Sequence, residues 1–340
     1  MPIKNEKKNQ HYVPKFYLRN FNNNQNCIAT FIHSKAKFIP QASLDSVVSK
    51  DYFYGKDLYI ENMFADFESK WATAFDIIIN DRDVSQEETA LAIDLVVSFT
   101  AFQYCRTLRT YDTQIGLSTF MSDYIHKTAS PNMDVDAFLK QYIPEDFNPM
   151  IAPIKAGFRI KEHFRSLSLL ILKNNSGSGF ITSDNPVILY NMLLSQREYK
   201  GNYGFNSKGL CVFLPLSPDL CFCFYDPKVY FPTNNDLIHI VLDEELNELN
   251  RLTCRNAYEF TFYTPKHSAE YAIKLDKHFV DNLESQTTLA QSNLGPVIWC
   301  KGASILDQFS LPFLTIRKAA RKTYIHPYQQ PPSRYPHTNI

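Results

Sequence analysis

The stretch Asn9-Gln10-His11-Tyr12-Val13-Pro14-Lys15-Phe16-Tyr17-Leu18-Arg19-Asn20-Phe21 decides how this chain is organised. It holds one histidine, two tyrosines, two phenylalanines, one arginine and one proline. Aromatic side chains at this density predict a segment that docks into the body of the protein and carries His11 there. A second dense stretch, Phe180-Ile181-Thr182-Ser183-Asp184-Asn185-Pro186-Val187, is its expected partner.

The composition is that of a globular protein with ample core residues. Of the 340 residues, 44% are hydrophobic and 21% are charged, which is enough for one large or two small domains. The 26 phenylalanines and 20 tyrosines supply a core, and only 10 glycines argue against glycine-rich cofactor loops. Because 35 basic residues balance 35 acidic ones, a strongly basic nucleic-acid binder is not indicated, although a local basic patch stays open.

The seven cysteines show no spacing typical of disulfide pairs or of a metal site. Their number is odd and no Cys-x-x-Cys pair occurs, so we expect neither a disulfide scaffold nor a structural zinc site. The first eight residues lack the apolar core of a secretory signal. The longest apolar run, Ala90 to Cys105, contains Asp94 and is too short to span a bilayer. These features predict a reduced, cytoplasmic protein that does not bind a membrane.

Helical periodicity dominates the first half of the chain. From Leu58 to Ile79, apolar residues recur at steps of three and four, which indicates one buried stripe. Glu61 and Glu68 lie two turns apart on its flank. They are either solvated carboxylates, or one of them is a metal ligand or the partner of an arginine.

A second helix begins with a capping box at Ser85-Gln-Glu-Glu88 and is predicted to run to about Thr110. It is apolar nearly all round, so it should be central and buried. Its last turns carry Gln103 and Arg106. A buried guanidinium either clamps an anion such as phosphate or carboxylate, or forms an ion pair with Asp94, Glu61 or Glu68.

The second half changes to strands, after a short β start at 27–33 and 37–40 and further helices at 117–127, 134–142 and 147–164. Strands are predicted at 167–172, 180–182, 187–190, 210–215, 220–225 and 258–263, with helices at 243–256 and 279–292. The first two strands are expected to form a hairpin. This order predicts an α+β fold, in which a mainly helical N-terminal block precedes a mostly antiparallel sheet with helices.

The expected domain organisation has three parts. Residues 1–8 are predicted to be flexible, and 9–310 to form a single α+β domain with a helical part at about 55–165 and a sheet part at about 166–265. Residues 317–340 form a basic and then proline-rich tail. The sequence does not indicate whether the protein is a monomer or an oligomer.

These residues resemble a known family. His11-Tyr12-Val13-Pro14, followed by Phe16 to Phe21, is similar to the signature of the prokaryotic HYVP family, domain of unknown function 4238. Later stretches fit the same pattern in order: Tyr52-Phe53-Tyr54, Ile60-Glu61 with Phe67-Glu68, Gln103-x-x-Arg106-Thr107, Ile181 to Val187, and Phe213 to Pro218. The resemblance covers roughly residues 9–265. Lys15 departs from it, because such proteins often have Gln or Arg there. The resemblance implies a shared fold and no activity.

His11 and Asp184 are the main candidates for chemistry. His11 is a candidate general base or metal ligand, or else a buried hydrogen-bonding plug that anchors the N-terminal segment. Val13-Pro14 keeps the chain extended after it. Asp184 and Asn185 follow a strand directly, where they either mount a catalytic group or form an Asx turn that Pro186 completes.

One site would combine these side chains. The catalytic residues would be His11, Asp184 and Asn185, the anion-binding residues Arg106, Gln103 and Arg19, and the metal ligands Asp184 and Glu68. This set suits hydrolysis of a phosphodiester with Mg²⁺ as the metal and His11 activating water. The hallmarks of other classes are missing: G-x-S-x-G, H-E-x-x-H, and the kinase and Rossmann signatures.

Three hypotheses follow. The first is a nuclease or nucleotide hydrolase, such as a toxin or defence effector, whose basic stretches at 4–8, 159–165 and 317–322 would contact nucleic acid or a nucleotide. The second is a non-enzymatic module that binds an anionic small molecule or a partner protein, which zero net charge favours. The third is a structural network, in which the motifs tie the N-terminal segment to the sheet.

Overall fold

The structure is a computed structural model that describes residues 8–22, 26–142, 147–196, 203–279, 287–292, 295–300, 305 and 307–324, with the backbone alone for 142, 287–292, 295–300 and 322–324. The helices are α1 (Lys15–Arg19), α2 (Tyr59–Ile79), α3 (Gln86–Cys105), α4 (Leu108–Thr128), α5 (Val135–Tyr142), α6 (Ile151–Arg165), α7 (Met192–Ser195), α8 (Asp243–Asn256), α9 (Ala269–Asp276) and α10 (Lys318–Tyr324).

The strands in the described ranges form five sheets. They are β1 (Asn9–His11), β2 (Cys27–Ile32), β3 (Lys37–Ser43), β4 (Ser49–Asp51), β5 (Ser168–Asn174), β6 (Thr182–Ser183), β7 (Ile188–Tyr190), β8 (Cys211–Ser217), β9 (Leu220–Tyr225), β10 (Tyr230–Pro232), β11 (Ile238–Val241), β12 (Phe260–Tyr263), β13 (Thr287–Ser292), β14 (Gly295–Cys300) and β15 (Leu314–Ile316). The largest sheet has the order β11-β5-β9-β8-β7, and a second has the order β3-β2-β12-β6. The pairs β1-β4, β10-β15 and β13-β14 complete the set.

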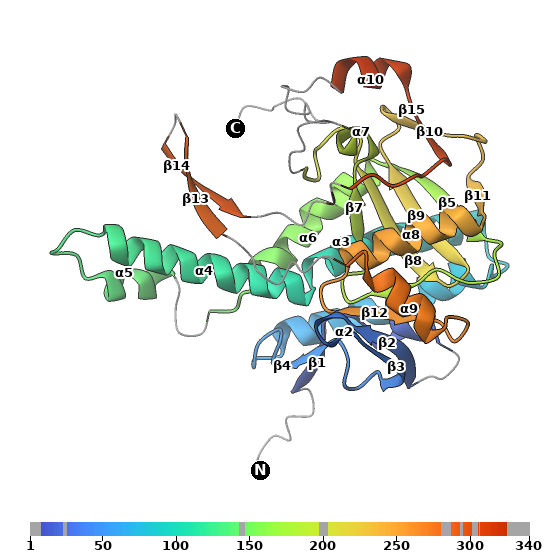
Figure 1. Ribbon diagram of the computed structural model, residues 1–340. Coiled ribbons are helices and arrows are strands. Elements are labelled where there is room, and N and C mark those ends of the chain that lie inside the picture. Colours follow the sequence, from blue (N-terminus) through green and yellow to red (C-terminus); the bar gives the residue numbers. More distant parts are fainter. Residues whose placement is uncertain are drawn as a thin grey trace, which may run out of the picture.

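The five-stranded sheet separates two layers of core. Side chains of a strand alternate between faces, and in β8 Val212 and Leu214 join the cluster with α2, α3 and α6 while Cys211 and Phe213 join the cluster with α8. Figure 1 shows α8 along one side of this sheet and the helical block on the other. Apart from the parallel pair β11-β5, the strand pairs are antiparallel. The predicted α+β fold is therefore confirmed.

The helical block follows the local sequence signals. The capping box at Ser85 is present, with the Glu88 N–H donating to Ser85 Oγ at 3.2 Å and the Ser85 N–H donating to Glu88 Oε2 at 2.9 Å. Helix α3 is buried over most of its second half, as predicted. It ends at Cys105 instead of about Thr110. The reason is a new N-cap, because Thr107 Oγ1 accepts from the Thr110 N–H at 3.3 Å and starts α4.

Two predictions about strands and helices are wrong. β5 does not form a hairpin with the 180–182 strand: it pairs with β9 and β11, whereas β6 pairs with β12 in the other sheet. The Asn250 side chain holds the crossing segment, accepting from the Ile181 N–H at 3.1 Å and donating to Gly179 O at 3.0 Å. The helix predicted at 279–292 is replaced by β13, as far as that stretch is described; 280–286 lie outside the described residues.

Helices α4 and α5 project from the body as an arm (Figure 1). Helix α4 has 21 residues and is therefore about 31 Å long. No residue along this length is buried. Between the two helices lies a hollow of about 370 Å³ lined by Leu117, Met121, Ile125 and Phe138, among others. Within the described part of the chain, no helix combines the length and apolar character needed to cross a bilayer.

Candidate functional site

The opening motif and the stretch at 180–187 are in contact, and the contact runs through Tyr17. Its hydroxyl donates to Pro215 O at 2.7 Å and lies 2.7 Å from Thr182 Oγ1. At this place β8 shifts register between Pro215 and Ser217, as expected where a proline interrupts a ladder. Sequence reasoning paired the two stretches but did not single out Tyr17. The need of a buried tyrosine hydroxyl for a partner is the signal that points to it.

The imidazole of His11 faces the loop between β3 and β4. Its Nε2 lies 3.0 Å from Leu44 O, and the ring is half-buried. Burial lowers the pKa of His11, with Lys15 acting in the same direction and Asp45 opposing. Within the described residues, no contact joins His11 to Asp184.

Tyr12 is a buried residue of the opening motif. The pKa of Tyr12 is raised by burial first and then by the Asp184 carboxylate. Its neighbour Gln10 is wholly buried: Gln10 Oε1 accepts from the Tyr54 N–H at 2.6 Å, and Nε2 donates to Gly55 O at 3.2 Å. The motif thus contributes backbone anchors and tyrosine hydroxyls to the interior.

Gln103 and Arg106 form a chain of hydrogen bonds that connects the opening motif to α2. Gln103 Nε2 donates to Tyr12 O at 2.9 Å, and Gln103 Oε1 accepts from Arg106 Nε at 2.8 Å. Arg106 Nη1 donates to Glu68 Oε1 at 2.8 Å. The predicted alternative in which Glu68 is the ion-pair partner of a buried arginine is confirmed.

Arg106 is enclosed as well as paired. Its side chain is 0% exposed, and the guanidinium carbon lies 4.5 Å from the Phe64 ring centroid and 5.4 Å from that of Trp71. Such stacking suits a guanidinium better than an ammonium. Nη2 is buried and has no hydrogen-bond partner in the described structure. The anion-binding role of Arg106 and Gln103 stays a prediction. Their observed contacts connect parts of the protein to one another.

Asp184 is wholly buried at the end of β6. Its Oδ1 accepts from the Tyr258 N–H at 2.9 Å, and Oδ2 accepts from the N–H groups of Glu259 at 2.7 Å and Phe260 at 3.1 Å. Burial raises the pKa of Asp184 to about 6, while the three backbone donors and the Arg109 charge act in the opposite direction. This carboxylate closes the turn that leads from α8 into β12.

Asn185 forms a reciprocal amide pair with Asn256. Asn185 Nδ2 donates to Asn256 O at 3.0 Å, and Asn256 Nδ2 donates to Asn185 O at 2.6 Å and to Val187 O at 3.1 Å. Arg109 Nη2 donates to the carbonyls of Asn256 and Ala257, both at 2.9 Å. A cation there complements the C-terminus of α8. The turn at 183–187 is thereby tied to the C-terminal end of α8, which Arg109 links in turn to α4.

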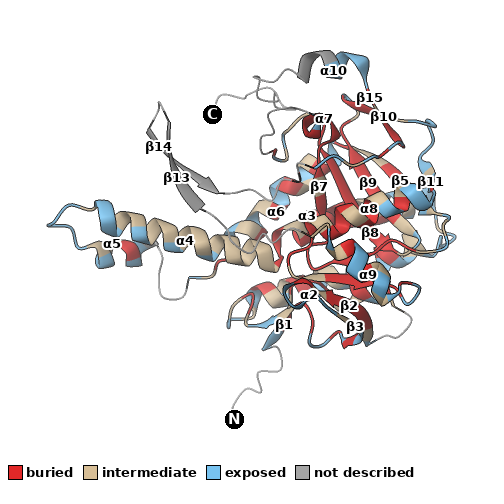
Figure 2. Cartoon of the chain, viewed as in Figure 1, coloured by how far each residue is buried: buried red, intermediate tan, exposed pale blue. Residues whose placement is uncertain are grey.

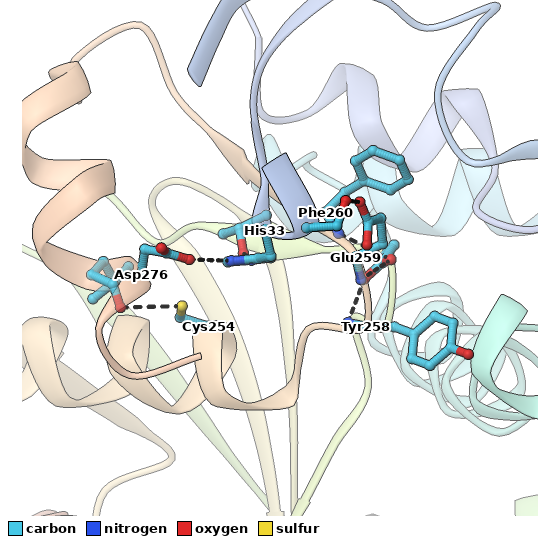
Figure 3. A network of polar contacts seen from close by, with 10 residues as sticks. His33, Cys254, Tyr258, Glu259, Phe260 and Asp276 are labelled. Carbon is cyan, nitrogen blue, oxygen red and sulfur yellow. Dashed lines mark hydrogen bonds and ion pairs between the residues drawn. The ribbon is translucent and has the colours of Figure 1, made fainter. Parts of the chain in front are cut away.

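A second polar network, which sequence reasoning did not single out, surrounds His33. Its Nδ1 lies 2.6 Å from Asp276 Oδ1 and its Nε2 2.6 Å from Thr261 Oγ1, while its ring stacks on Phe279 at 3.9 Å. Figure 3 shows His33 between α9, which carries Asp276, and the strand that begins near Phe260. Burial lowers the pKa of His33, and Asp276 acts against that change. In the sequence, the only feature that points to His33 is its position directly after a strand of mainly apolar residues.

Arg19, a predicted anion-binding residue, lines a surface hollow. That hollow, of about 390 Å³ between α1 and α2, is also lined by Asn20, Asp76 and Asn80. Asp76 already pairs with Arg82 there, with Arg82 Nε 3.0 Å from Asp76 Oδ2. The hollow therefore mixes both signs of charge and does not select an anion.

The residues present do not fit a shared magnesium site. Mg²⁺ takes several oxygen ligands in octahedral geometry. The oxygens of Asp184 accept three backbone hydrogen bonds, whereas Glu68 is engaged with Arg106 in a different network. Among the side chains that the structure describes, no group of three or more His, Cys, Asp or Glu could hold a metal ion.

Comparison with known proteins yields one match. Comparison with curated proteins and with solved structures gave no match. A family described as "Protein of unknown function (DUF4238)" matches residues 9–267, which takes in the opening motif, the helical block and both large sheets. This chain belongs to that family, the one its opening motif resembles.

Proposed function

We propose that this protein is a non-enzymatic module that binds a partner protein. The polar side chains that the sequence marks out for chemistry support this, because most of them are engaged by their own chain. Asp184, Asn185, Gln103 and Arg106 are buried and hold backbone segments together. These side chains use their hydrogen-bonding groups on the protein's own backbone and on one another, as buried polar groups in protein interiors usually do.

The observation that carries the proposal is a cluster of exposed apolar side chains. Of the large apolar side chains that are exposed in the described part of the chain, Leu237, Ile238, Ile240 and Leu242 lie within six residues. Each is between 47% and 58% exposed. Because side chains alternate along a strand, Ile238 and Ile240 lie on the same face of β11. Apolar side chains that are exposed side by side mark a candidate interaction site, whereas those scattered singly do not.

Affinity capture followed by reconstitution tests the proposal. The immobilised wild-type protein and an Ile238→Lys/Ile240→Lys variant are compared with a Leu91→Lys variant, which changes a distant exposed apolar residue. We expect a protein that wild type and Leu91→Lys retain and the double variant does not. After purification, its affinity for the double variant should be lower by about tenfold or more in calorimetry.

Enzyme assays give the outcome that would overturn the proposal. The phosphodiesterase predicted from the sequence has one supporting observation, the pKa of Asp184 near 6, since perturbed carboxyl groups mark many active sites. RNA, DNA and nucleotides are incubated with Mg²⁺ and wild type, His11→Ala or Asp184→Asn. Cleavage by wild type that both variants lose would replace the binding module by an enzyme.

A further inference from the structure

Strand β11 lies at an open edge of the five-stranded sheet. Its only partner strand among the described residues is β5, with Ile238 opposite Ile171 in parallel register. The inward groups are engaged, because the Ile171 N–H donates to Leu237 O at 2.8 Å and the Asn175 N–H donates to Val241 O at 3.1 Å. Figure 1 shows β11 on the outer right of the molecule, away from the helical arm.

The outward backbone groups of β11 belong to Ile238 and Ile240. Since backbone groups alternate in direction along a strand and those of Leu237 and Val241 face β5, the N–H and C=O of Ile238 and Ile240 face away from it. In the described structure no hydrogen bond of these four groups to another residue occurs. At Leu242 the edge ends, because the Leu242 N–H donates to Glu245 Oε2 at 3.2 Å and its carbonyl accepts from Leu246 at 2.9 Å.

Strand β11 is a short edge strand of four residues, and inside it the chain has few of the features that prevent strand addition. Between Leu237 and Leu242 there is no proline, no lysine and no register shift. The side chains of Ile238 and Ile240 are exposed on one face of the sheet, whereas Val241 on the other face is buried. Figure 2 shows exposed residues along this part of the chain beside the buried strands of the sheet. An added strand would cover both isoleucines while it satisfied the outward backbone groups.

Charges at the two ends of β11 select the incoming strand. Asp236 precedes it, and Asp243 and Glu244 follow it, and all three residues are exposed. Antiparallel pairing of two copies of β11 would bring the Asp236 end of one copy toward the Asp243 end of the other, which is unfavourable for like charges. Lys173, opposite Ile240 in register, lies on β5, one strand further in. The charges therefore favour a basic partner over a second copy of this chain.

We propose that β11 is a strand-addition site for an extended segment of a partner protein, with apolar residues at alternate positions and Lys or Arg at both ends. This inference rests on the proposed function and specifies its mode of contact. Backbone hydrogen bonds to Ile238 and Ile240 hold the segment, the two isoleucine side chains pack on its apolar residues, and the acidic ends pair with its cations.

Fluorescence polarisation with a defined peptide tests the inference. The probe is fluorescein-Lys-Arg-Val-Thr-Val-Thr-Val-Arg-Lys-amide, and the first control peptide has Glu in place of every Lys and Arg. A second control carries N-methyl groups on alternate valines, which removes backbone donors and leaves the charges. We expect saturable binding of the probe that weakens as the salt concentration rises, and no saturation with either control.

Variants of β11 separate backbone pairing from apolar contact. Ile240→Pro removes one outward N–H and leaves the ladder to β5 intact, so the affinity should fall by about tenfold or more. Ile240→Thr keeps the N–H and the β-branch and should bind less tightly than wild type but more tightly than Ile240→Pro. Asp236→Asn/Asp243→Asn should reduce the salt dependence. Far-ultraviolet circular dichroism confirms that each variant is folded.

The outcomes distinguish the inference from the proposed function. Equal binding of the three peptides, or binding that Ile240→Pro does not change, rejects strand addition at β11. Another outcome is a captured protein that binds wild type, loses affinity for Ile238→Lys/Ile240→Lys and binds Ile240→Pro as tightly as wild type. That result keeps the proposed binding module and rejects only pairing through the backbone of β11. Sedimentation of the protein alone as a dimer that Ile240→Pro dissociates would show that a second copy is the occupant.

Discussion

At the scale of single residues, Asp184 shows how burial can oppose hydrogen bonding. Three backbone N–H groups stabilise the carboxylate, yet burial still raises the pKa of Asp184 to about 6. Between about pH 4 and pH 6 the folded state therefore binds this proton more tightly than the unfolded chain does. The contribution of Asp184 to stability consequently falls as the pH rises through that window.

The variant Asp184→Asn tests this balance. It exchanges one carboxylate oxygen for an amide that cannot accept the backbone N–H groups, so the free energy of unfolding should fall by about 1–3 kcal/mol. The difference between wild type and variant should narrow as the pH rises from about 4 to about 6, because only wild type ionises there. Urea unfolding across this range measures both effects. A difference that widens with pH would contradict the raised pKa.

His33 should make the protein less stable as the pH falls, whereas Asp184 makes it less stable as the pH rises. Burial lowers its folded pKa below the ordinary value of 6.5, so the unfolded chain binds the proton more readily. The stability that neutral His33 contributes is present above about pH 6.5 and is lost as the pH falls through the folded pKa. Wild type should lose stability relative to His33→Gln on acidification from about pH 7. Thermal unfolding of both proteins at matched pH tests this; a constant difference would rule out His33 as the group responsible.

At the scale of elements, Tyr17 joins α1 to the sheets. Replacing Tyr17 with Phe leaves the ring contacts but removes the hydrogen bonds to Pro215 O and Thr182 Oγ1. We expect a loss of about 1–3 kcal/mol in the free energy of unfolding, because a buried carbonyl loses its donor. Tyr59→Phe is the matched control, since Tyr59 is 73% exposed and should change nothing measurable. Equal stability of the two variants would show that Tyr17 is not an anchor.

Local signals predicted elements where they act within a few residues. The bounds of α8 and β9 match the predicted ranges 243–256 and 220–225, and Ser85 identified the start of α3. The hairpin prediction at 167–182 was wrong because pairing of β5 is decided by strands far along the chain. The break between α3 and α4 was missed because the Thr107 cap competes with an otherwise continuous helical pattern.

The candidate site was predictable in part. A buried guanidinium needs a partner, and Glu68 was named among the candidates for Arg106. The meeting of the two dense stretches was also predicted, and Tyr17 with Thr182 confirms it. The direction of His11 was not predictable, since successive residues of an extended segment face opposite ways and one position decides which side chain turns inward. Tyr12 is buried, whereas His11 is half-buried and contacts Leu44.

At the scale of the whole molecule, the helical block and the sheet share one core. Residues of α2 and α3 form a single buried cluster with Leu214 and Phe222 of β8 and β9. A fragment of residues 1–165 would expose the apolar faces that meet this sheet. We expect it to keep helical circular dichroism, to lose its near-ultraviolet signal and to bind anilinonaphthalene sulfonate. Cooperative unfolding of the fragment would instead show two separable domains.

The hydrogen bond from Tyr17 to Pro215 spans 198 positions of the chain. On the ribosome, at about 5–20 residues per second, its acceptor is synthesised about 10–40 s after its donor. During that interval the aromatic residues around Tyr17 have left the exit tunnel before the strand that shelters them exists. We therefore expect slower elongation ahead of β8 to lengthen the time for which these aromatic side chains are exposed and open to aggregation.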